Sequence, residues 1–291
     1  MQKLHRKQQQ WMPIAFLAPA VILFSVYVIF PIVQSVWLSF YQWDGLGEKI
    51  FVGFGNYIEL FQDDQFWTAF VNNIYWLIFF MLAPPIGLLL ALFLNQKMMG
   101  IRFVKAMFFF PFVISQVVVG LVFSWFYDPS FGLFNKFIEL FGFQPIAVLS
   151  DPNVVTFGII AAGLWPQIAY CMILYLTGLN NLNPDQIEAA RLDGAYGWKM
   201  LRHVILPQLK PATFIAIVVT VIGALRSFDL VATMTSGGPF GSSSVLAYFM
   251  YEQSIFNYRV GYGAAIATVL FLMMDIYIAY FLWRMLKSEK A

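Results

Sequence analysis

The stretch that decides the fold is Glu188-Ala-Ala-Arg-Leu-Asp-Gly194, which is followed by Leu206-Pro207. It is a short polar segment in a chain that is 60% hydrophobic and only 11% charged. Soluble domains have about 25% charged residues, so much of this chain's surface must face lipid. The polar segment therefore interrupts a chain that is built to cross a membrane.

Six apolar stretches on either side of this segment are long enough to cross a bilayer, which takes roughly 20 residues. Backbone groups cannot stay unpaired in hydrocarbon, so each stretch is expected to be a helix. The sequence thus predicts an all-α, polytopic membrane protein with six transmembrane helices. Their approximate bounds are Ile14–Val36, Phe70–Leu94, Val104–Tyr127, Val154–Leu179, Pro211–Met234 and Tyr262–Trp283.

Lys and Arg indicate the orientation, because they gather on the cytoplasmic side of membrane proteins. Only Lys49, Lys136 and Arg259 flank the spans on one side, and Arg226 lies inside a span. The other side holds both termini and the polar segment, which are therefore predicted to be cytoplasmic. Its basic residues are Lys3, Arg6, Lys7, Lys97, Arg102, Lys105, Arg191, Lys199, Arg202, Lys210, Arg284, Lys287 and Lys290.

The N-terminus has some features of a cleaved signal peptide, since Lys3–Lys7 precede an apolar run and Ala18-Pro-Ala20. The apolar run continues to about Val36, and Pro is poor at the middle position of a cleavage site. A retained first helix is therefore the favoured interpretation. Cys171 is the single cysteine and lies within a span, so it gives no disulfide framework.

The polar segment contains its own start and stop signals. Asn183-Pro-Asp185 predicts a helix start, with Asn as the cap, Pro in the first turn and an acid at the positive helix end. Gly194 permits a bend or a close backbone approach. Pro207 and Pro211 lack the amide donors that a smooth helix needs. We expect a short helix, a hinge and an elbow at the cytoplasmic surface.

The whole pattern, E-A-A-x-x-x-G followed ten residues later by an aliphatic residue-x-Leu-Pro, resembles the EAA loop of binding-protein-dependent ABC importer permeases. Val204 stands where that family more often has Ile. Other parts are similar to the carbohydrate branch, such as the maltose and glycerol-phosphate permeases. These parts are Phe66-Trp67 with Asn73, Phe228-Asp229 with Thr235-Ser-Gly-Gly-Pro239, and Gly261–Ala267, and the resemblance covers about Pro13 to Leu286.

The resemblance implies a type I ABC importer permease fold in a bacterial inner membrane. It implies a cytoplasmic N-terminus (1–12), a six-helix permease domain (13–286) with a coupling loop at about 181–208, and a cytoplasmic tail (287–291). A separate ATPase docks on the loop in this family, where a carboxylate with two small alanines beside it is suited to pair an Arg. The expected coupling residues are Glu188, Ala189, Ala190, Asp193, Gly194, Leu206 and Pro207.

The chain itself has no phosphate-binding glycine loop and no catalytic or metal-ligating constellation. It is therefore not expected to be an enzyme or to bind a cofactor. ATP and Mg would sit on the partner ATPase. The resemblance implies two ATPase subunits, a second homologous permease subunit, a periplasmic or extracellular solute-binding protein and a carbohydrate substrate, but no nucleic acid.

Polar residues within the spans are candidates for a substrate cavity. Trp165 and Tyr170 match aromatic positions that line the cavity of the maltose permease, and Gln167 and Thr220 match by position. The alternative is that the aromatics pack between helices and the hydroxyls bond backbone carbonyls. The full candidate set is Trp165, Gln167, Tyr170, Thr220, Ser227 and Arg226.

Two acidic residues in the spans raise separate questions. Arg226 and Asp229 are three residues apart, so on one helix they would share a face and form a structural pair. The alternative is that Arg226 binds an anionic sugar derivative. Asp275 has no evident partner on its own helix and should face another helix or the cavity.

Two other classes of function are alternatives to an importer subunit. A secondary, ion-coupled transporter would need carboxylates deep in several spans, and only Asp275 comes close. An integral-membrane enzyme would need His or acidic residues clustered at one membrane face, and the sequence shows no such cluster. The favoured function is the transmembrane subunit of an ATP-driven importer for a sugar, oligosaccharide or sugar derivative, working by alternating access.

Overall fold

The structure is a computed structural model that describes residue 12 and residues 16–96 and 99–289. The predicted N-terminal segment lies almost wholly outside these residues, as do Lys97 and Lys290. The chain divides into two compact units, Met1–Asp63 with Met250–Phe271, and Asp64–Phe249 with Leu272–Ala291.

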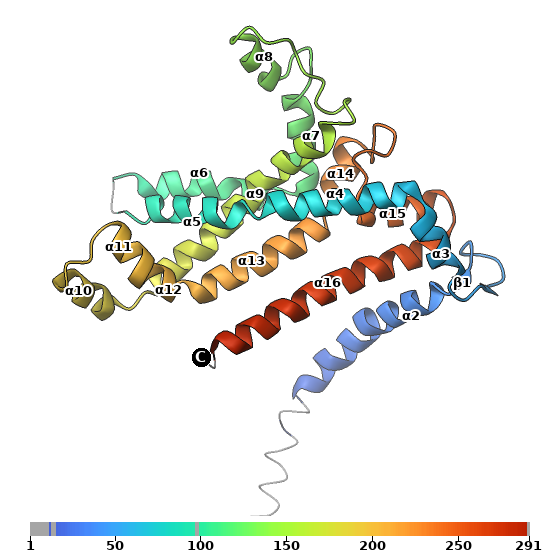
Figure 1. The fold of residues 1–291 in the computed structure, drawn as a ribbon, viewed down its shortest axis with the longest axis horizontal. Coiled ribbons are helices and arrows are strands. Elements are labelled where there is room, and N and C mark those ends of the chain that lie inside the picture. Colours follow the sequence, from blue (N-terminus) through green and yellow to red (C-terminus); the bar gives the residue numbers. More distant parts are fainter. Residues whose placement is uncertain (1–11, 13–15, 97–98, 290–291) are drawn as a thin grey trace, which may run out of the picture. The chain divides into compact units, whose positions relative to one another are not determined.

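Helices make up nearly all of the regular structure (Figure 1). In chain order the elements are η1 Ser25–Ile29, α2 Phe30–Leu38, β1 Tyr41–Gln42, β2 Ile50–Phe51, α3 Gly55–Gln62, α4 Asp64–Phe80, α5 Ala83–Leu94, α6 Ile101–Val113, α7 Gln116–Phe126, α8 Leu133–Glu139, α9 Val155–Asn180, α10 Pro184–Leu192, α11 Trp198–Met200, η2 Leu201–Ile205, α12 Leu206–Gln208, α13 Lys210–Leu225, α14 Asp229–Met234, α15 Leu246–Tyr251, η3 Glu252–Phe256 and α16 Val260–Glu289.

The predicted membrane-spanning helices are confirmed in kind, but two of them are not straight. Four helices are long and apolar enough to cross a membrane, and they are Phe16–Leu38, Asp64–Leu94, Val155–Asn180 and Val260–Phe281. Two further helix pairs are bent, by 100° between α6 and α7 and by 71° between Trp198–Gln208 and α13. If each bent pair is one span, the described residues give six spans, the number predicted, although the fifth helix ends at Leu225 and does not run to Met234.

The prediction of one continuous third helix over Val104–Tyr127 was wrong, because the chain turns between α6 and α7. Ile114 is extended, and Ser115 caps α7 by accepting a hydrogen bond from the Val118 backbone N–H at 3.4 Å. An N-cap residue has non-helical backbone angles, so a helix cannot run through it.

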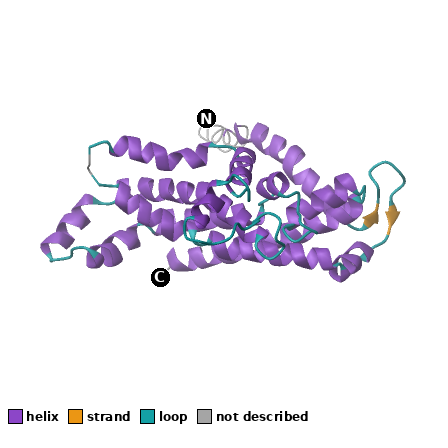
Figure 2. Ribbon diagram, turned by 90° about the horizontal axis from the view of Figure 1, so that it is seen from above, coloured by secondary structure: helices purple, strands orange, loops and turns teal. Residues whose placement is uncertain are grey.

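The first unit contains a small hairpin, in which β1 and β2 pair antiparallel with Tyr41 opposite Phe51 (orange in Figure 2). The Asn56 side-chain amide of α3 donates to the backbone carbonyls of Ser39 and Tyr41, at 2.8 and 2.9 Å. These bonds fix α3 against the base of the hairpin. They also satisfy both carbonyls, of which the one of Ser39 is in a buried bond.

The second unit is centred on α5, α9 and α13, which meet through small side chains. Its buried cluster includes Ala83, Ala91, Cys171, Met172, Tyr175, Leu179, Leu209 and Ala216. A Cβ added at Gly87 of α5 would lie 2.6 Å from the Cys171 Cβ and 2.8 Å from the Met172 backbone nitrogen. Close approach through small residues is how membrane helices associate without a hydrophobic driving force.

Polar side chains of α4 hold the loop before α15 in place. Asn72 donates to the carbonyls of Ser242 and Ser244 at 2.7 and 2.8 Å, and Asn73 accepts from the Leu246 N–H at 2.8 Å. All three bonds join residues about 170 positions apart in the sequence. These bonds connect the first helix of the second unit to the loop before α15 and to the start of α15.

Candidate functional site

The polar segment folds as a capped helix followed by a tight turn. The Asn183 side chain accepts a hydrogen bond from the Asp185 N–H at 2.9 Å, and Pro184 occupies the first helical position. At the other end, Gly194 has a φ of +78°, the Gly194 N–H donates to Arg191 O at 3.1 Å, and the Ala195 N–H donates to Ala190 O at 2.8 Å. This bond pair is a Schellman motif, which needs a left-handed residue at the position of Gly194.

A side chain that sequence reasoning missed ties the two ends of the segment together. The Gln208 Oε1 accepts the Asn183 backbone N–H at 2.9 Å, and its Nε2 donates to Val204 O at 3.2 Å. The start of α10 is therefore bonded directly to α12, 25 residues later. These hydrogen bonds join the start of the segment, after α9, to its end, before α13.

The predicted elbow between Pro207 and Pro211 is confirmed as the 71° bend that separates α12 from α13. Leu209 stands in the bend and is fully buried. A Cβ on Gly178, near the end of α9, would lie 2.8 Å from the Leu209 Cδ2 atom. Leu209 thus anchors the elbow on α9.

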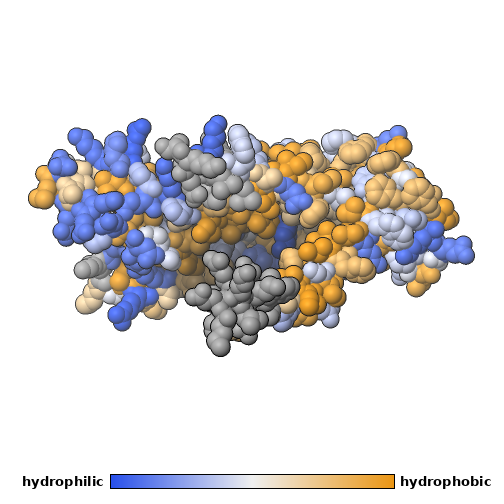
Figure 3. All heavy atoms as spheres, turned by 90° about the horizontal axis from the view of Figure 1, so that it is seen from below, coloured by the Kyte–Doolittle hydropathy of each residue, from blue (hydrophilic) through white to orange (hydrophobic). Residues whose placement is uncertain are grey.

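The predicted coupling residues lie mostly at the surface of this end of the second unit. Figure 3 shows many hydrophilic residues gathered at this end of the unit. Exposed side chains include Leu192, which is 90% exposed, and Trp198, which is 67% exposed. Glu188, Ala189, Asp193, Gly194 and Pro207 are exposed, and Ala190 and Leu206 are half-buried.

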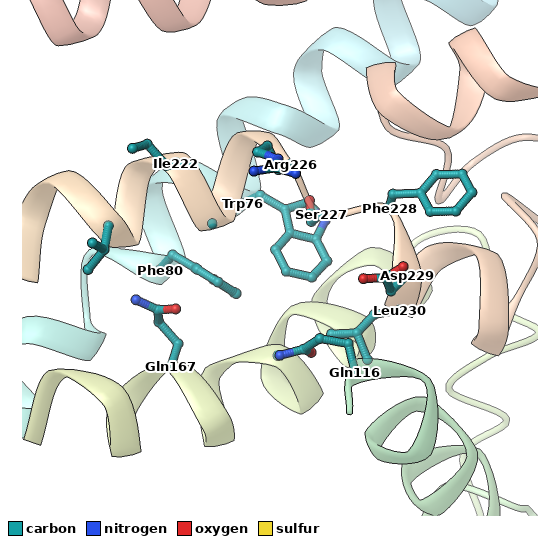
Figure 4. Close-up of a pocket in the computed structure, with 13 residues that line it drawn as sticks. Trp76, Phe80, Gln116, Gln167, Ile222, Arg226, Ser227, Phe228, Asp229 and Leu230 are labelled. Atoms are coloured by element: carbon teal, nitrogen blue, oxygen red, sulfur yellow. The ribbon is translucent and has the colours of Figure 1, made fainter. Parts of the chain in front are cut away.

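A cavity of about 340 Å³ opens in the second unit, at the far end of α13 from the elbow. Gln167 of α9, Arg226 and Ser227 line it, so the structure brings these three candidates together (Figure 4). Thr220 is fully buried beside it, and its Oγ1 accepts a hydrogen bond from the Gln167 Nε2 at 2.8 Å. The other lining residues are Trp76, Phe80, Gln116, Gly163, Val219, Ile222, Gly223, Phe228, Asp229 and Leu230.

Trp165 and Tyr170 lie outside this cavity. Trp165 lines a separate apolar pocket of about 390 Å³, together with residues of α5 and α6. The Tyr170 ring stacks on Phe112 of α6, with centroids 4.8 Å apart and an angle of 4° between the planes. The Tyr170 ring therefore packs between α9 and α6, and the Trp165 side chain faces the apolar pocket.

The expected pairing of Arg226 with Asp229 on one helix was wrong. Helix α13 ends at Leu225, the Phe228 N–H donates to Arg226 O at 2.8 Å, and the Ser227 hydroxyl donates to Ala224 O at 2.8 Å. A side chain that donates to a nearby backbone carbonyl competes with the hydrogen bonds of the helix. Because the helix ends at this turn, the three-residue spacing no longer places Arg226 and Asp229 on one helix face. No ion pair joins Arg226 to Asp229, although both line the cavity.

Two further cavity residues escaped the sequence analysis. Trp76 of α4 is 1% exposed, and its indole Nε1–H has no hydrogen-bond partner. Gln116 begins α7, directly after the bend that hydropathy alone does not reveal. Buried Trp N–H groups usually find a partner, so the Trp76 donor is an unsatisfied buried group beside the cavity.

Similar proteins identify the chain's family. Residues 83–288 match the family described as "binding-protein-dependent transport system inner membrane component". A probable ABC transporter permease protein of Pyrococcus horikoshii is 35% identical over 281 residues, which is 95% of this chain and 96% of that one. The trehalose/maltose transport system permease protein of Thermococcus litoralis is 30% identical, over 88% of this chain and 87% of that one.

Solved structures agree on the fold. A bacterial ABC transporter that imports the acidic polysaccharide alginate has a chain with a TM-score of 0.83 and 22% identity, and the match covers 98% of both chains. The fold described above is therefore shared with that chain along almost its whole length. The chain is a member of the binding-protein-dependent transport system inner membrane components, the multi-pass permease subunits of ABC transporters.

Proposed function

We propose that this chain is the membrane-spanning subunit of an ATP-driven sugar importer and that sugar passes through the cavity at the end of α13. Relatives named for trehalose and maltose, for lactose and for starch degradation products support a sugar. The observation that carries the proposal is structural continuity: one helix, α13, begins at the elbow of the polar segment and ends at Leu225, directly before Arg226 in the cavity.

The polar segment is the proposed docking site of a separate ATPase, which would hold ATP and Mg. Glu188 offers an exposed carboxylate to an Arg of the ATPase, and Ala189 lets the two surfaces approach closely. The Schellman turn at Gly194 and the Gln208 bonds give the segment a fixed shape. Displacement of the docked ATPase would therefore move the elbow and, with it, α13.

The cavity offers a sugar both donors and acceptors of hydrogen bonds. Arg226 donates, Asp229 accepts, and Gln116 does both. A few placed polar groups among apolar walls are typical of small-molecule sites. The mixture suits the hydroxyl groups of a carbohydrate, which also donate and accept.

The proposed complex has further subunits. Two ATPase subunits would act on this chain and on a second, homologous permease subunit, while a solute-binding protein would deliver the sugar from outside. Both termini and the polar segment would be cytoplasmic, as the distribution of Lys and Arg predicts.

Reversing the charge at Glu188 tests the docking role. Glu188→Lys in the assembled transporter should abolish sugar uptake and co-purification of the ATPase, while the chain still reaches the membrane. The matched control is Glu139→Lys, which makes the same change at an exposed residue of α8. Normal uptake by Glu188→Lys would refute the coupling role.

A second candidate function, import of an anionic sugar derivative, is favoured by Arg226, which lies in the cavity and forms no ion pair with any residue that the structure describes. Arg226→Gln should then impair uptake of a uronate or sulfonated sugar far more than that of a neutral sugar. Equal effects on both would exclude a role for Arg226 in charge selection and leave the neutral-sugar function in place.

A further inference from the structure

Three polar side chains form a hydrogen-bonded cluster between α9 and α13, beside the cavity. The Gln167 Nε2 donates to the Thr220 Oγ1 at 2.8 Å and to the Cys171 Sγ at 3.9 Å. The Thr220 Oγ1 and the Cys171 Sγ are 3.5 Å apart. Thr220 and Cys171 are fully buried, whereas Gln167 is half-buried and lines the cavity. Of the three, Gln167 is therefore the side chain that a ligand in the cavity can touch.

The cluster fixes which end of the Gln167 amide faces the cavity. A side-chain amide carries two donors on its nitrogen and one acceptor oxygen. Both donors have a buried acceptor, the Thr220 oxygen and the more weakly accepting Cys171 sulfur. The nitrogen is therefore occupied on the buried side of the amide, and the oxygen is left for the cavity.

The surroundings of the Gln167 oxygen agree with this orientation. A Cβ built at Gly223, which lines the cavity, would lie 3.4 Å from the Gln167 Oε1. Thr220 and Gly223 are three residues apart on α13, which places them on one side of the helix. The amide thus runs along α13, with its nitrogen at the buried Thr220 and its oxygen at the open Gly223. Figure 4 shows the Gln167 oxygen on the side of Gln116 and the nitrogen turned away from it.

The two possible orientations of this amide ask for opposite groups on a ligand. With the oxygen in the cavity, the ligand has to donate a hydrogen bond. With the amide reversed, the ligand would have to accept one. A sugar hydroxyl can do either, whereas a fluorine or an ether oxygen cannot donate.

We propose that Thr220 is a positioning residue for sugar specificity, which holds the Gln167 amide so that its Oε1 accepts a hydrogen bond from a sugar hydroxyl. The inference rests on the proposed function, because it takes the cavity as the path of the sugar. Thr220 acts through Gln167 and does not touch the sugar. The cavity thereby selects a ligand that carries a donor at this point.

The selection arises from the penalty for an unpaired acceptor. A ligand that lacks the donor would cover the Gln167 Oε1 without bonding it, which costs more than the bond itself contributes. Sites built to bond a hydroxyl reject analogues without it for this reason. Without Thr220 the amide is free to turn, and its nitrogen can then meet an acceptor on the analogue. The discrimination between hydroxyl and fluorine should therefore fall.

Fluorinated sugars test this orientation, because a C–F group cannot donate a hydrogen bond. The probes are maltose, trehalose and lactose, for which relatives of this chain are named, and their monofluoro analogues. Cells with the assembled transporter are assayed for uptake, and each result is expressed as the ratio of parent sugar to analogue. The preferences of the solute-binding protein are the same for every variant, so they cancel when ratios are compared.

Thr220→Val should lower this ratio by about 2- to 10-fold for at least one fluorinated position, which corresponds to one neutral hydrogen bond. Thr220→Ser keeps the hydroxyl and should leave the ratios unchanged. The matched control is Thr268→Val, the same change at a buried Thr of α16 whose hydroxyl donates to Ala264 O, and it should also leave them unchanged. The amount of chain in the membrane reports on folding.

A double variant separates positioning from a structural role or a direct contact. In a Gln167→Leu background, Thr220→Val should not change the ratios further, because Thr220 acts through the Gln167 amide. An effect of Thr220→Val that persists without Gln167 would overturn the proposal. Thr220→Val that reduces uptake of parent sugars and analogues equally would also overturn it, since that result shows a structural role alone.

Failure of the proposed function has a different signature. If the unmodified transporter takes up none of the three sugars, the result counts against the sugar-importer function itself. If it takes up one of them and Thr220→Val leaves every ratio unchanged, only the positioning role of Thr220 fails.

Discussion

Replacing Gly194 with Ala should loosen the turn that ends α10 without creating any clash. Gly194 has a φ of +78°, and no atom lies within 4 Å of a Cβ built there. The cost is therefore that of a left-handed backbone for an L-residue, about 1–2 kcal/mol. Such a free-energy change multiplies the open population of the turn by about 5 to 30. Gly194→Asn should cost less, because Asn tolerates this conformation better.

Trypsin reports on this opening, since Arg191 and Lys199 flank the turn and each lies in a helix. When opening is fast, cleavage follows the open population, so Gly194→Ala should be cut at these residues about 5 to 30 times faster. The matched control is Gly142→Ala, at a glycine with φ +80° and equally open surroundings, which should leave these two cleavage rates unchanged. Equal rates for Gly194→Ala and the unmodified chain would refute the backbone argument, as would an Asn variant cut faster than the Ala variant.

Three further changes test other parts of the structure. Gly87→Ala should destabilise the second unit by about 1–3 kcal/mol, because its Cβ would lie 2.6 Å from the Cys171 Cβ. In thermal unfolding in detergent, its midpoint should be lower than that of the control Gly223→Ala, whose Cβ meets nothing nearer than 3.4 Å. Gln208→Ala removes the bond to the Asn183 N–H and should cost about 0.5–1.5 kcal/mol, seen as faster tryptic cleavage at Arg191, whereas Gln208→Glu keeps the acceptor and should be cut at nearly the original rate. The backbone N–H groups of Gly47 and Leu46 lower the pKa of the Asp44 carboxyl below 3.8. These hydrogen bonds therefore stabilise the hairpin turn above that pH, and the stabilisation is lost as the pH falls through the folded pKa. The carboxyl ¹³C chemical shift of Asp44 should titrate below pH 3.8, and a midpoint above that pH would contradict the two hydrogen bonds.

The sequence predicts best those features whose causes are local. Asn183, Pro184 and Gly194 act through their own backbone and nearest neighbours, so the capped helix and its turn could be read from residue types alone. The apolar runs predict the spans in the same way, because hydrocarbon accepts only helices. The direction of a helix cannot be predicted in this way, because the summed hydropathy of a span does not change when the helix bends. Ser115 was the available signal for the 100° bend, as an N-cap residue in front of α7.

The cavity depends on contacts between distant parts of the chain, and sequence reasoning found only part of it. Trp76 and Gln116 come from spans two and three, and nothing in their neighbourhoods distinguishes them from packing residues. Arg226 and Asp229 were assigned to one helix face because three-residue spacing assumes an unbroken helix. The helix is in fact broken here, because the Ser227 hydroxyl donates to Ala224 O and the chain turns at Phe228.

The length of α13 sets the scale of the motion that it can deliver. Its 16 residues make a rod of about 24 Å, with Leu209 as a pivot at one end and Arg226 just beyond the other. A tilt of about 5° around that pivot moves the far end by about 2 Å, the size of helix shifts that accompany switching in other proteins. That distance is enough to break or make a hydrogen bond to a sugar hydroxyl. A small rotation of α13, driven at the membrane surface, would therefore be enough to change the hydrogen bonds between the transporter and its sugar.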